Sequence, residues 1–252
     1  FSEVYKNVDG VELRDKNREV MDGYVNEEGA IVARPGLRFV GSMLSGSDFT
    51  TGILGQYVVT ADLVAAYSGD KLKSYAYDGT TFTPQAFTST VSITNAIPTW
   101  ASGRLVSTDT QYYFFANGGS IYYTSSGLTW SQLTGANTPT AATHILWIDG
   151  YLMANIVGSN KIIWSNLDNP FTWAALSTFR ANADGDINVA IKVRNREIFI
   201  FGQNSIEIWE NDGVTPFSRV PGGFIEAGCI APYSIISDDL VLFWLVTYRR
   251  FL

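Results

Sequence analysis

The feature that most constrains the fold is a fourfold repeat in the central part of the chain. Each copy has a β-rich segment, a turn containing Gly, a second β-rich segment, a polar turn and then an aromatic residue. The equivalent turn glycines are Gly69, Gly118, Gly158 and Gly202, which are 49, 40 and 44 residues apart. A mean spacing near 44 residues is typical of β-propeller blades, each of which is a small antiparallel sheet.

An apolar run upstream of the repeated segments supplies a further strand, as in residues 144–148 and 189–193. Sheets of this size do not bury both faces alone, so neighbouring units must stack. We therefore predict an all-β propeller of four-stranded blades. A fifth unit starts near Ile230, includes residues 240–245, and is expected to be incomplete. A twisted β-sandwich with long hairpins stays as an alternative.

Composition supports a β fold. Apolar residues make up 46% of the chain, which excludes intrinsic disorder. Charged residues reach 16%, below the usual share of about 25%. No Glu occurs between Gly29 and Arg196, so common surface helix formers are scarce there.

The N-terminal region differs from the rest. Residues 1–30 hold 12 of the 41 charged residues. We divide the chain into residues 1–50, a charged arm and a Gly/Ser-rich loop, and residues 51–252, the propeller. A strand is expected at about residues 37–40, after the Pro35-Gly36 turn. A weak helical stripe that includes Leu13 and Tyr24 is interrupted by glycines, so an arm or an edge segment fits equally well.

Charge and cysteine content restrict the partners and the compartment. The net charge of −7 and the pI of about 4.7 argue against DNA binding through a broad basic face. No run approaches the roughly 18 apolar residues of a membrane helix, and no signal peptide is recognisable. The single cysteine excludes an internal disulfide and fits a reducing cytoplasm. Because the first residue is Phe1, we expect part of the native sequence to be missing.

Few residues could perform catalysis. His144 is the one histidine, and it precedes an apolar run without any local triad signature, so we expect it at the start of a strand. Cys229 lacks a basic neighbour and is expected to be a small buried residue. We predict no catalytic, cofactor-binding or metal-binding residue.

Two segments match functional motifs in part. Residues 182–188 alternate oxygen-bearing side chains as a calcium loop does, but Gly185 is misplaced and no bidentate Glu follows, so a turn between blades is preferred. Gly127, Thr129 and Trp130 match part of a sialidase-type Asp box, but Ser125 replaces its Asp and Tyr123 its Ser. We interpret this second motif as purely structural.

A glycosidase remains the enzyme alternative, with Asp184 as a carboxylate to test. It needs two facing carboxylates, whereas most Asp residues of the repeats occupy turn positions: Asp70, Asp78, Asp168 and Asp212. The content of Trp and Tyr suggests a second alternative, a carbohydrate- or receptor-binding propeller. However, Trp164, Trp173 and Trp209 recur at equivalent blade positions, which is typical of core or interface residues.

Several segments resemble one protein family, the tail hub or nozzle proteins of short-tailed bacteriophages, also called packaged-DNA stabilisation proteins. The similarity spans roughly residues 31–246 and is carried by Pro35-Gly36-Leu37, residues 163–170 with Trp173, residues 179–209, residues 228–231 and residues 243–245. Residues 246–252 depart from the Gly-rich turn expected there.

The resemblance implies a non-enzymatic virion protein of the tail, assembled in the host cytoplasm, without cofactor or membrane contact. Family members generally are longer and form a ring, usually a hexamer, below the portal and its adaptor. The ring would extend the DNA channel, retain packaged DNA and carry tail spikes, fibres or a needle, and DNA would pass without sequence-specific binding. An acidic wall would repel phosphates. Residues 1–30 are a candidate docking arm, although a merely solvated tail fits equally well.

Overall fold

The computed structural model describes residues 54–68, 71–78, 81–85, 97–181, 185–214, 216–237 and 241–247, together with four short strands near the N-terminus. The contacts divide the chain into two units, Phe1–Gly41 and Ser42–Leu252. In the first unit, β1 (Tyr5–Lys6) pairs with β2 (Glu12–Leu13), and β3 (Gly23–Val25) pairs with β4 (Ile31–Ala33). Leu13 and Tyr24 therefore lie in strands rather than in a helix. The strand expected at residues 37–40 and the boundary expected at residue 50 lie outside the described residues.

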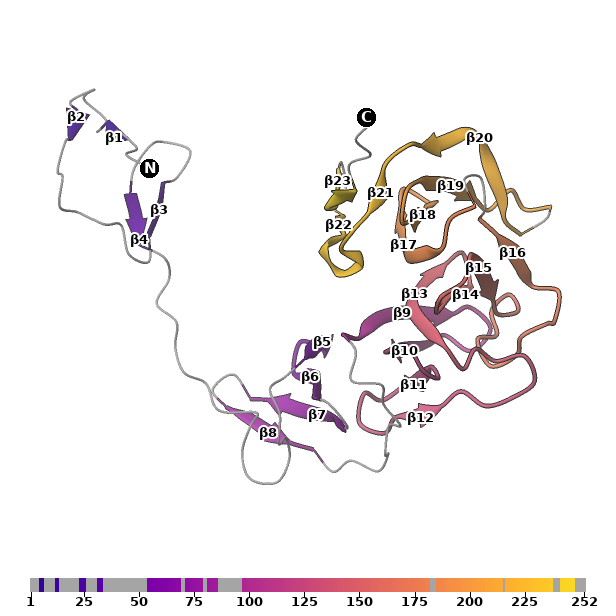
Figure 1. The fold of residues 1–252 in the computed structure, drawn as a ribbon. Coiled ribbons are helices and arrows are strands. Elements are labelled where there is room, and N and C mark those ends of the chain that lie inside the picture. Colours follow the sequence, from indigo (N-terminus) through magenta and orange to yellow (C-terminus); the bar gives the residue numbers. More distant parts are fainter. Residues whose placement is uncertain are drawn as a thin grey trace. The chain divides into compact units, whose positions relative to one another are not determined.

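The second unit contains four antiparallel sheets, each made of four strands in chain order (Figure 1). The strands of the first two sheets are β5 (Gly55–Thr60), β6 (Leu63–Ser68), β7 (Lys71–Tyr77) and β8 (Phe82–Pro84), then β9 (Thr99–Leu105), β10 (Thr110–Ala116), β11 (Tyr122–Thr124) and β12 (Ser131–Gln132). The next two sheets contain β13 (Ala142–Ile148), β14 (Tyr151–Ile156), β15 (Lys161–Trp164) and β16 (Thr178–Arg180), then β17 (Asn188–Arg194), β18 (Glu197–Gly202), β19 (Ile206–Glu210) and β20 (Ser218–Ile225).

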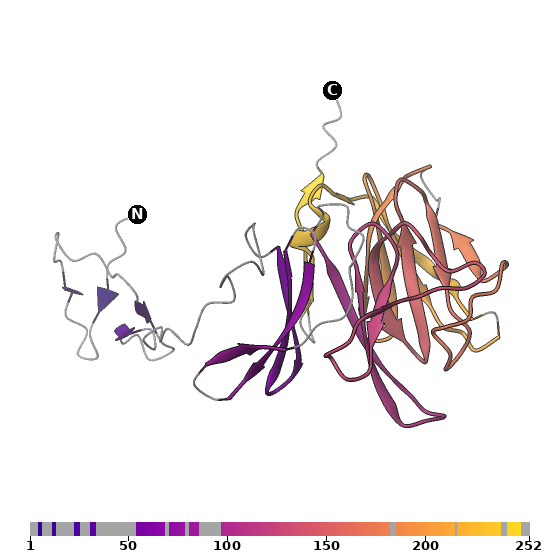
Figure 2. The same ribbon diagram turned by 90° about the horizontal axis from the view of Figure 1, so that it is seen from below.

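These sheets are the blades of a β-propeller. Their first strands are neighbours, β9 beside β13 and β13 beside β17. The sheets follow one another around an arc, with these first strands on its inner side (Figure 1), and they stack face to face when seen from below (Figure 2). The predicted propeller of four-stranded blades is confirmed. The β-sandwich alternative is wrong, because the described strands form four successive four-stranded sheets with neighbouring first strands rather than two facing sheets.

The hydrophobic core lies between the blades. Side chains alternate across a strand, so each blade has two faces to bury. Phe115 of β10 packs against the first blade, and its neighbour Phe114 packs against the third. In the third blade, Ile145 packs against the second blade and Leu146 packs against the fourth. The two faces of a blade are therefore buried because neighbouring blades stack on them.

An aromatic residue just before the fourth strand recurs at these interfaces. Trp130, Trp173 and Phe217 are 1%, 5% and 6% exposed. Trp130 joins the cluster between the first and second blades, Trp173 the next one, and Phe217 the one after that. Trp164 of β15 and Trp209 of β19 both belong to the interface between the third and fourth blades, which they reach from opposite sides, so the two are not at equivalent blade positions as expected. The interpretation of the recurring tryptophans as interface residues agrees with these positions.

Polar residues form the tight turns between the first and second strands. Asp109, Asp149 and Asn195 occupy equivalent turns with φ of 53°, 47° and 50°. This left-handed region is disfavoured for most residues and is tolerated by Asp and Asn. In the second and third blades, the turn between the second and third strands reaches the following blade, because the Gly118 amide donates to the Ala142 carbonyl and the Asn188 amide to the Ser159 carbonyl.

A smaller group of strands follows the fourth blade, and we call it the fifth unit because it corresponds to the fifth repeat of the chain. In it, β21 (Gly228–Cys229) pairs with β24 (Val246–Thr247), and β22 (Ile236–Ser237) pairs with β23 (Leu242–Phe243), with a 3-10 turn η1 (Pro232–Ser234) between β21 and β22. It begins close to the predicted Ile230. A Cβ at Gly228 would lie 2.0 Å from the Gln203 carbonyl oxygen, so only glycine permits this approach to the fourth blade. Within the described part of the chain, no helix has the length and apolar character needed to cross a membrane.

Candidate functional site

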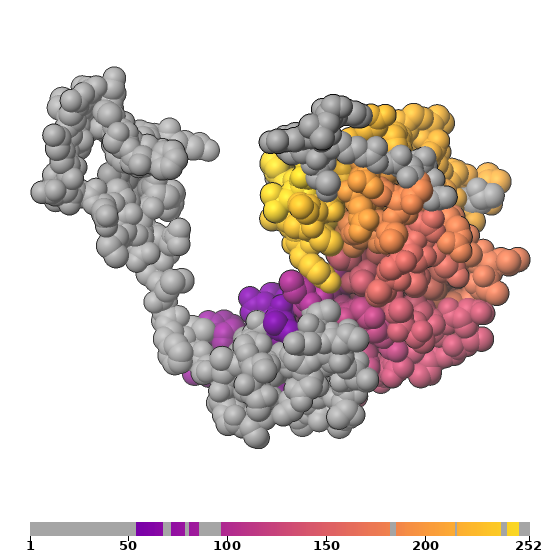
Figure 3. Space-filling model, viewed as in Figure 1, coloured from indigo at the N-terminus to yellow at the C-terminus, as the bar shows by residue number. Residues whose placement is uncertain are grey.

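A cavity of about 540 Å³ lies at the centre of the propeller. Its walls come from the inner strands β5, β9, β13 and β17 and from the η1 segment of the fifth unit. The space-filling view shows the surface hollowed between the purple first blade and the yellow fifth unit (Figure 3). Four aromatic side chains and one ammonium group line this cavity: Tyr57, Trp100, Trp147, Tyr233 and Lys192.

His144 also lines the cavity, from β13. It is 7% exposed and stacks on Tyr233, with ring centres 5.0 Å apart and planes 27° apart. Burial lowers the pKa of His144 to about 4, and the nearby Lys192 charge contributes, although a hydrogen bond to the Pro232 backbone opposes the shift. Its Nδ1 has no hydrogen-bond partner among the described residues. His144 therefore lacks the carboxylate that orients the histidine of a Ser-His-Asp triad.

The buried, neutral His144 predicts a stability that falls in mild acid. A folded pKa below the ordinary 6.5 means that the unfolded chain binds the proton more readily. The contribution is fully present above pH 6.5 and is lost as the pH falls towards 4, with a loss of about 2 kcal/mol by pH 5. Urea unfolding of the wild type and of His144→Gln at pH 7 and pH 5 measures this loss, and the variant should lack it.

The chain's single histidine offers an independent check on the same prediction. An untagged protein gives one imidazole signal in an NMR titration, and that signal should stay neutral well below pH 6. Titration near pH 6.5 would contradict the buried, neutral state.

Cys229 lies on β21 and is 2% exposed. Burial raises the pKa of its thiol, which keeps it protonated and unreactive at neutral pH. Its position within the cluster of the fourth blade and fifth unit agrees with the expected small buried residue.

Asp186 is a buried carboxylate that connects two parts of the fourth blade. Its Oδ2 accepts from the backbone amides of Asn204 (2.7 Å) and Ser205 (2.8 Å) and from the Ser205 hydroxyl (3.1 Å), and its Oδ1 accepts from the Asn204 side chain (2.7 Å). These donors come from the turn between β18 and β19. Asp184 and its neighbours at 182 and 183 lie outside the described residues. Where side chains are described, no three metal-binding groups converge.

Asp168 joins the third blade to the second. Its carboxylate accepts from the backbone amides of Val106 and Ser107, both at 2.7 Å, from a hairpin 61 residues earlier in the chain. Asp149 makes a similar connection to the fourth blade, accepting from Arg196 and Asn211 at 3.0 Å each. Asp78 and Asp212 accept from amides within their own turns, as expected, and Asp70 lies outside the described residues.

The bridge at Asp168 predicts a second pH effect. Hydrogen bonds from Ser107, chiefly from its side chain, hold the pKa of Asp168 below the ordinary 3.8. The stabilisation is therefore present above that value and disappears as the pH falls through the folded pKa. The Tm of Asp168→Asn should lie below that of the wild type at neutral pH, and the two should converge only as the pH falls through the lowered folded pKa of Asp168. A Tm difference that stays constant through the titration of the Asp168 carboxylate would contradict this prediction.

The partial Asp box lies at the interface between the first two blades. The Ser74 hydroxyl donates to the Gly127 carbonyl, and the Trp130 indole donates to Ser74 Oγ at 3.5 Å. Gly127 itself has φ of 74° and faces Val59 and Leu63 of the first blade. The structural interpretation of this motif agrees with these contacts.

Sequence reasoning missed the cavity and the bridges between blades. Neither the Asp168–Ser107 contact nor the convergence of His144, Lys192 and Tyr233 leaves a local signal. The turn residues Asp109, Asp149 and Asn195 do have a local sequence signal, because each is a polar residue between the first two strands of its blade.

Fold and interfaces define the class of protein as a β-propeller whose blades are tied together by aromatic clusters and by turn carboxylates. The family described as bacteriophage P22 Gp10, beta-propeller, matches residues 114–249, more than half of the chain. The protein belongs to this phage stabilisation family, whose members are structural phage proteins.

The comparison with solved structures found similar folds at low sequence identity. A protein provisionally described as a 6-phosphogluconolactonase from Bacteroides uniformis is 13% identical, with a TM-score of 0.50, and the match covers 73% of this chain and 60% of that one. Apo AztD from Citrobacter koseri (13% identity, TM-score 0.46, 69% and 47%) and a protein from Lactobacillus plantarum (13%, 0.49, 83% and 64%) are also similar. The chain thus spans less than two thirds of each of these structures. A comparison with curated proteins found no match.

Proposed function

We propose that the protein is a structural component of the phage virion and acts as a tail hub, or nozzle. In this role it forms a ring, usually of six copies, below the portal and adaptor. The ring extends the DNA channel, retains the packaged genome and anchors a spike, fibre or needle. Membership of the P22 Gp10 family is the observation that carries the proposal.

Charge supports a channel role. The chain carries a net charge of −7, so its average surface repels phosphate groups. A tube through which DNA must slide benefits from weak adhesion, because each cation that binds a phosphate strengthens non-specific binding.

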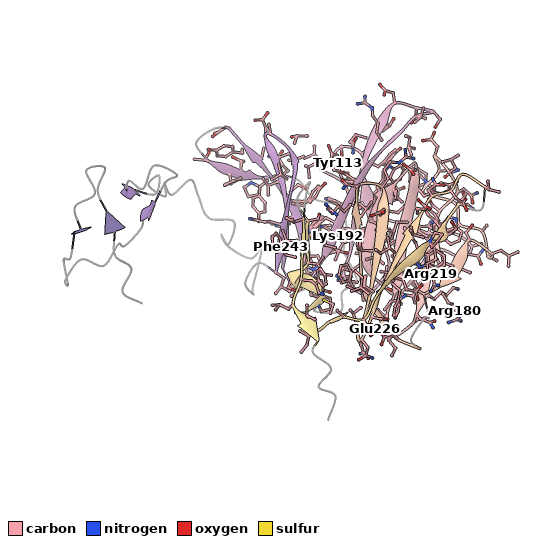
Figure 4. All side chains as sticks on the ribbon, turned by 90° about the horizontal axis from the view of Figure 1, so that it is seen from above. Tyr113, Arg180, Lys192, Arg219, Glu226 and Phe243 are labelled. Carbon is pink, nitrogen blue, oxygen red and sulfur yellow. The ribbon has the colours of Figure 1, made fainter. Side chains whose placement is uncertain are left out.

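An apolar face of the fifth unit supports assembly with other chains. Ile236 of β22 and Phe243 of β23 are register partners and are 65% and 60% exposed. Phe243 is labelled in Figure 4. Exposed apolar residues grouped on one strand pair are typical of contact surfaces.

Mass determination by native mass spectrometry tests the proposal, with the protein alone and mixed with a portal–adaptor complex. We expect a ring of about six copies, formed alone or on the adaptor. Phe243→Asp should weaken its formation more than Leu176→Asp, which places the same charge at a position that is 89% exposed. A protein that stays monomeric and does not bind the portal–adaptor complex would contradict the proposal.

The alternatives receive less support. All seven tryptophans are described, and each is buried or half-buried, so they do not form an exposed sugar-binding surface, although Trp100 and Trp147 line the central cavity. Among the described tyrosines, Tyr233 is the exposed one. Reproducible binding on a glycan array would support the carbohydrate-binding alternative. Glycoside hydrolysis that is lost on changing Asp184 would support the enzyme alternative.

A further inference from the structure

We propose that the central cavity binds a planar organic monoanion, with the aromatic walls holding its body and the Lys192 ammonium pairing with its acidic group. This site is separate from the proposed tail role and concerns the single chain.

The size of the cavity fits a small molecule. Its volume of about 540 Å³ falls within the range of roughly 300–1,000 Å³ found for ligand pockets. Its walls are mainly apolar and aromatic, with few polar groups, which is also typical of such sites.

Two of the aromatic walls are held rigidly. Tyr57 stacks on Trp100 with ring centres 5.4 Å apart and planes 15° apart. Trp147 stacks on Phe114 at 5.9 Å and 9°, and it lies so close to Gly103 that a Cβ there would be 2.0 Å from the indole. Rigid aromatic surfaces bind planar ligands with little loss of side-chain entropy.

Lys192 supplies the charge preference. It lies in the middle of β17, is half-buried, and makes no hydrogen bond or ion pair with any described residue. Among the described residues that line the cavity there is no Asp or Glu, and His144 is neutral, so the Lys192 ammonium group is the one formal charge in this described lining. In Figure 4, Lys192 lies towards Phe243 and away from Arg180 and Arg219, which mark the outer strands β16 and β20.

The balance of charge selects the ligand class. A half-buried cation that has no counter-ion among the described residues is unfavourably placed, and pairing with an anion relieves this cost. One lysine matches one negative charge, which favours a carboxylate or sulfonate over a phosphate dianion. Duplex DNA does not fit into a cavity of this volume.

The test uses 8-anilinonaphthalene-1-sulfonate, whose fluorescence reports binding, and two competitors that differ in charge. We expect one saturable site per chain, and we expect indole-3-acetate to displace the probe better than the neutral indole-3-acetamide. Lys192→Met should weaken probe binding about tenfold and remove the preference for the carboxylate. Lys192→Arg should keep both, and Lys161→Met, on β15, should match the wild type.

Unsaturable binding, equal displacement by the acid and the amide, or unchanged binding in Lys192→Met would each overturn the proposal. The comparison of acid with amide uses the wild type alone, so it decides the question even if a variant folds poorly. This binding experiment does not measure ring formation, so a negative result for the cavity would leave the tail proposal intact.

Discussion

Replacing Trp130 with Ala should lower the free energy of unfolding by about 3–5 kcal/mol, the usual cost of removing a large buried aromatic side chain. Trp130 is 1% exposed and fills the interface between the first two blades. Its ring meets that of Trp100 edge to face, with centres 5.9 Å apart. Its removal leaves a cavity that two stacked sheets cannot close without shifting against each other.

Denaturant unfolding followed by circular dichroism and by tryptophan fluorescence measures the Trp130→Ala effect. Ser131→Ala, at the exposed next residue, is the matched control and should change the stability by less than about 0.5 kcal/mol. A loss below about 1 kcal/mol in Trp130→Ala would show that the interface does not depend on this side chain.

Asp186→Ala should cost on the order of 4 kcal/mol, because several buried donors lose their acceptor at once. Asp186 is 7% exposed, and its carboxylate accepts four hydrogen bonds from Asn204 and Ser205. Two of these donors are backbone amides, which no rotamer change can redirect to water.

The same unfolding assay measures the Asp186→Ala effect. Asp62→Ala, at an exposed hairpin position of the first blade, is the control and should be nearly neutral. Calcium added to the wild type should not raise its stability, because the Asp186 oxygens are already occupied. Stabilisation by calcium that is lost in Asp186→Ala would instead support the calcium-loop interpretation of residues 182–188.

The strand pattern of this fold could be predicted because blade formation is local. The β-rich segments on the two sides of Gly158 lie within β14 and β15, and the segment before Gly202 lies within β18. The apolar runs at 144–148 and 189–193 supply the first strands of their blades. Repetition also indicated the buried aromatic positions, such as Trp130 and Trp173, since equivalent residues occupy equivalent environments.

Contacts between blades could not be predicted in the same way. Asp168 had the properties of an ordinary turn residue, and only the stacking of blades brings it to Ser107. The cavity residues His144, Lys192 and Tyr233 come from three segments, and their proximity follows from the arc of the blades. The low pKa of His144 likewise arises from tertiary burial, which no sequence neighbour reveals.

Cryo-electron microscopy of purified phage particles tests the central claim, a structural role in the virion, most directly. We expect a ring of propeller-shaped density below the portal and adaptor, into which the four stacked blades fit without rearrangement. Particles that lack the protein should contain less packaged DNA. Intact, DNA-filled particles that show no such ring, and in which the protein is absent, would contradict it.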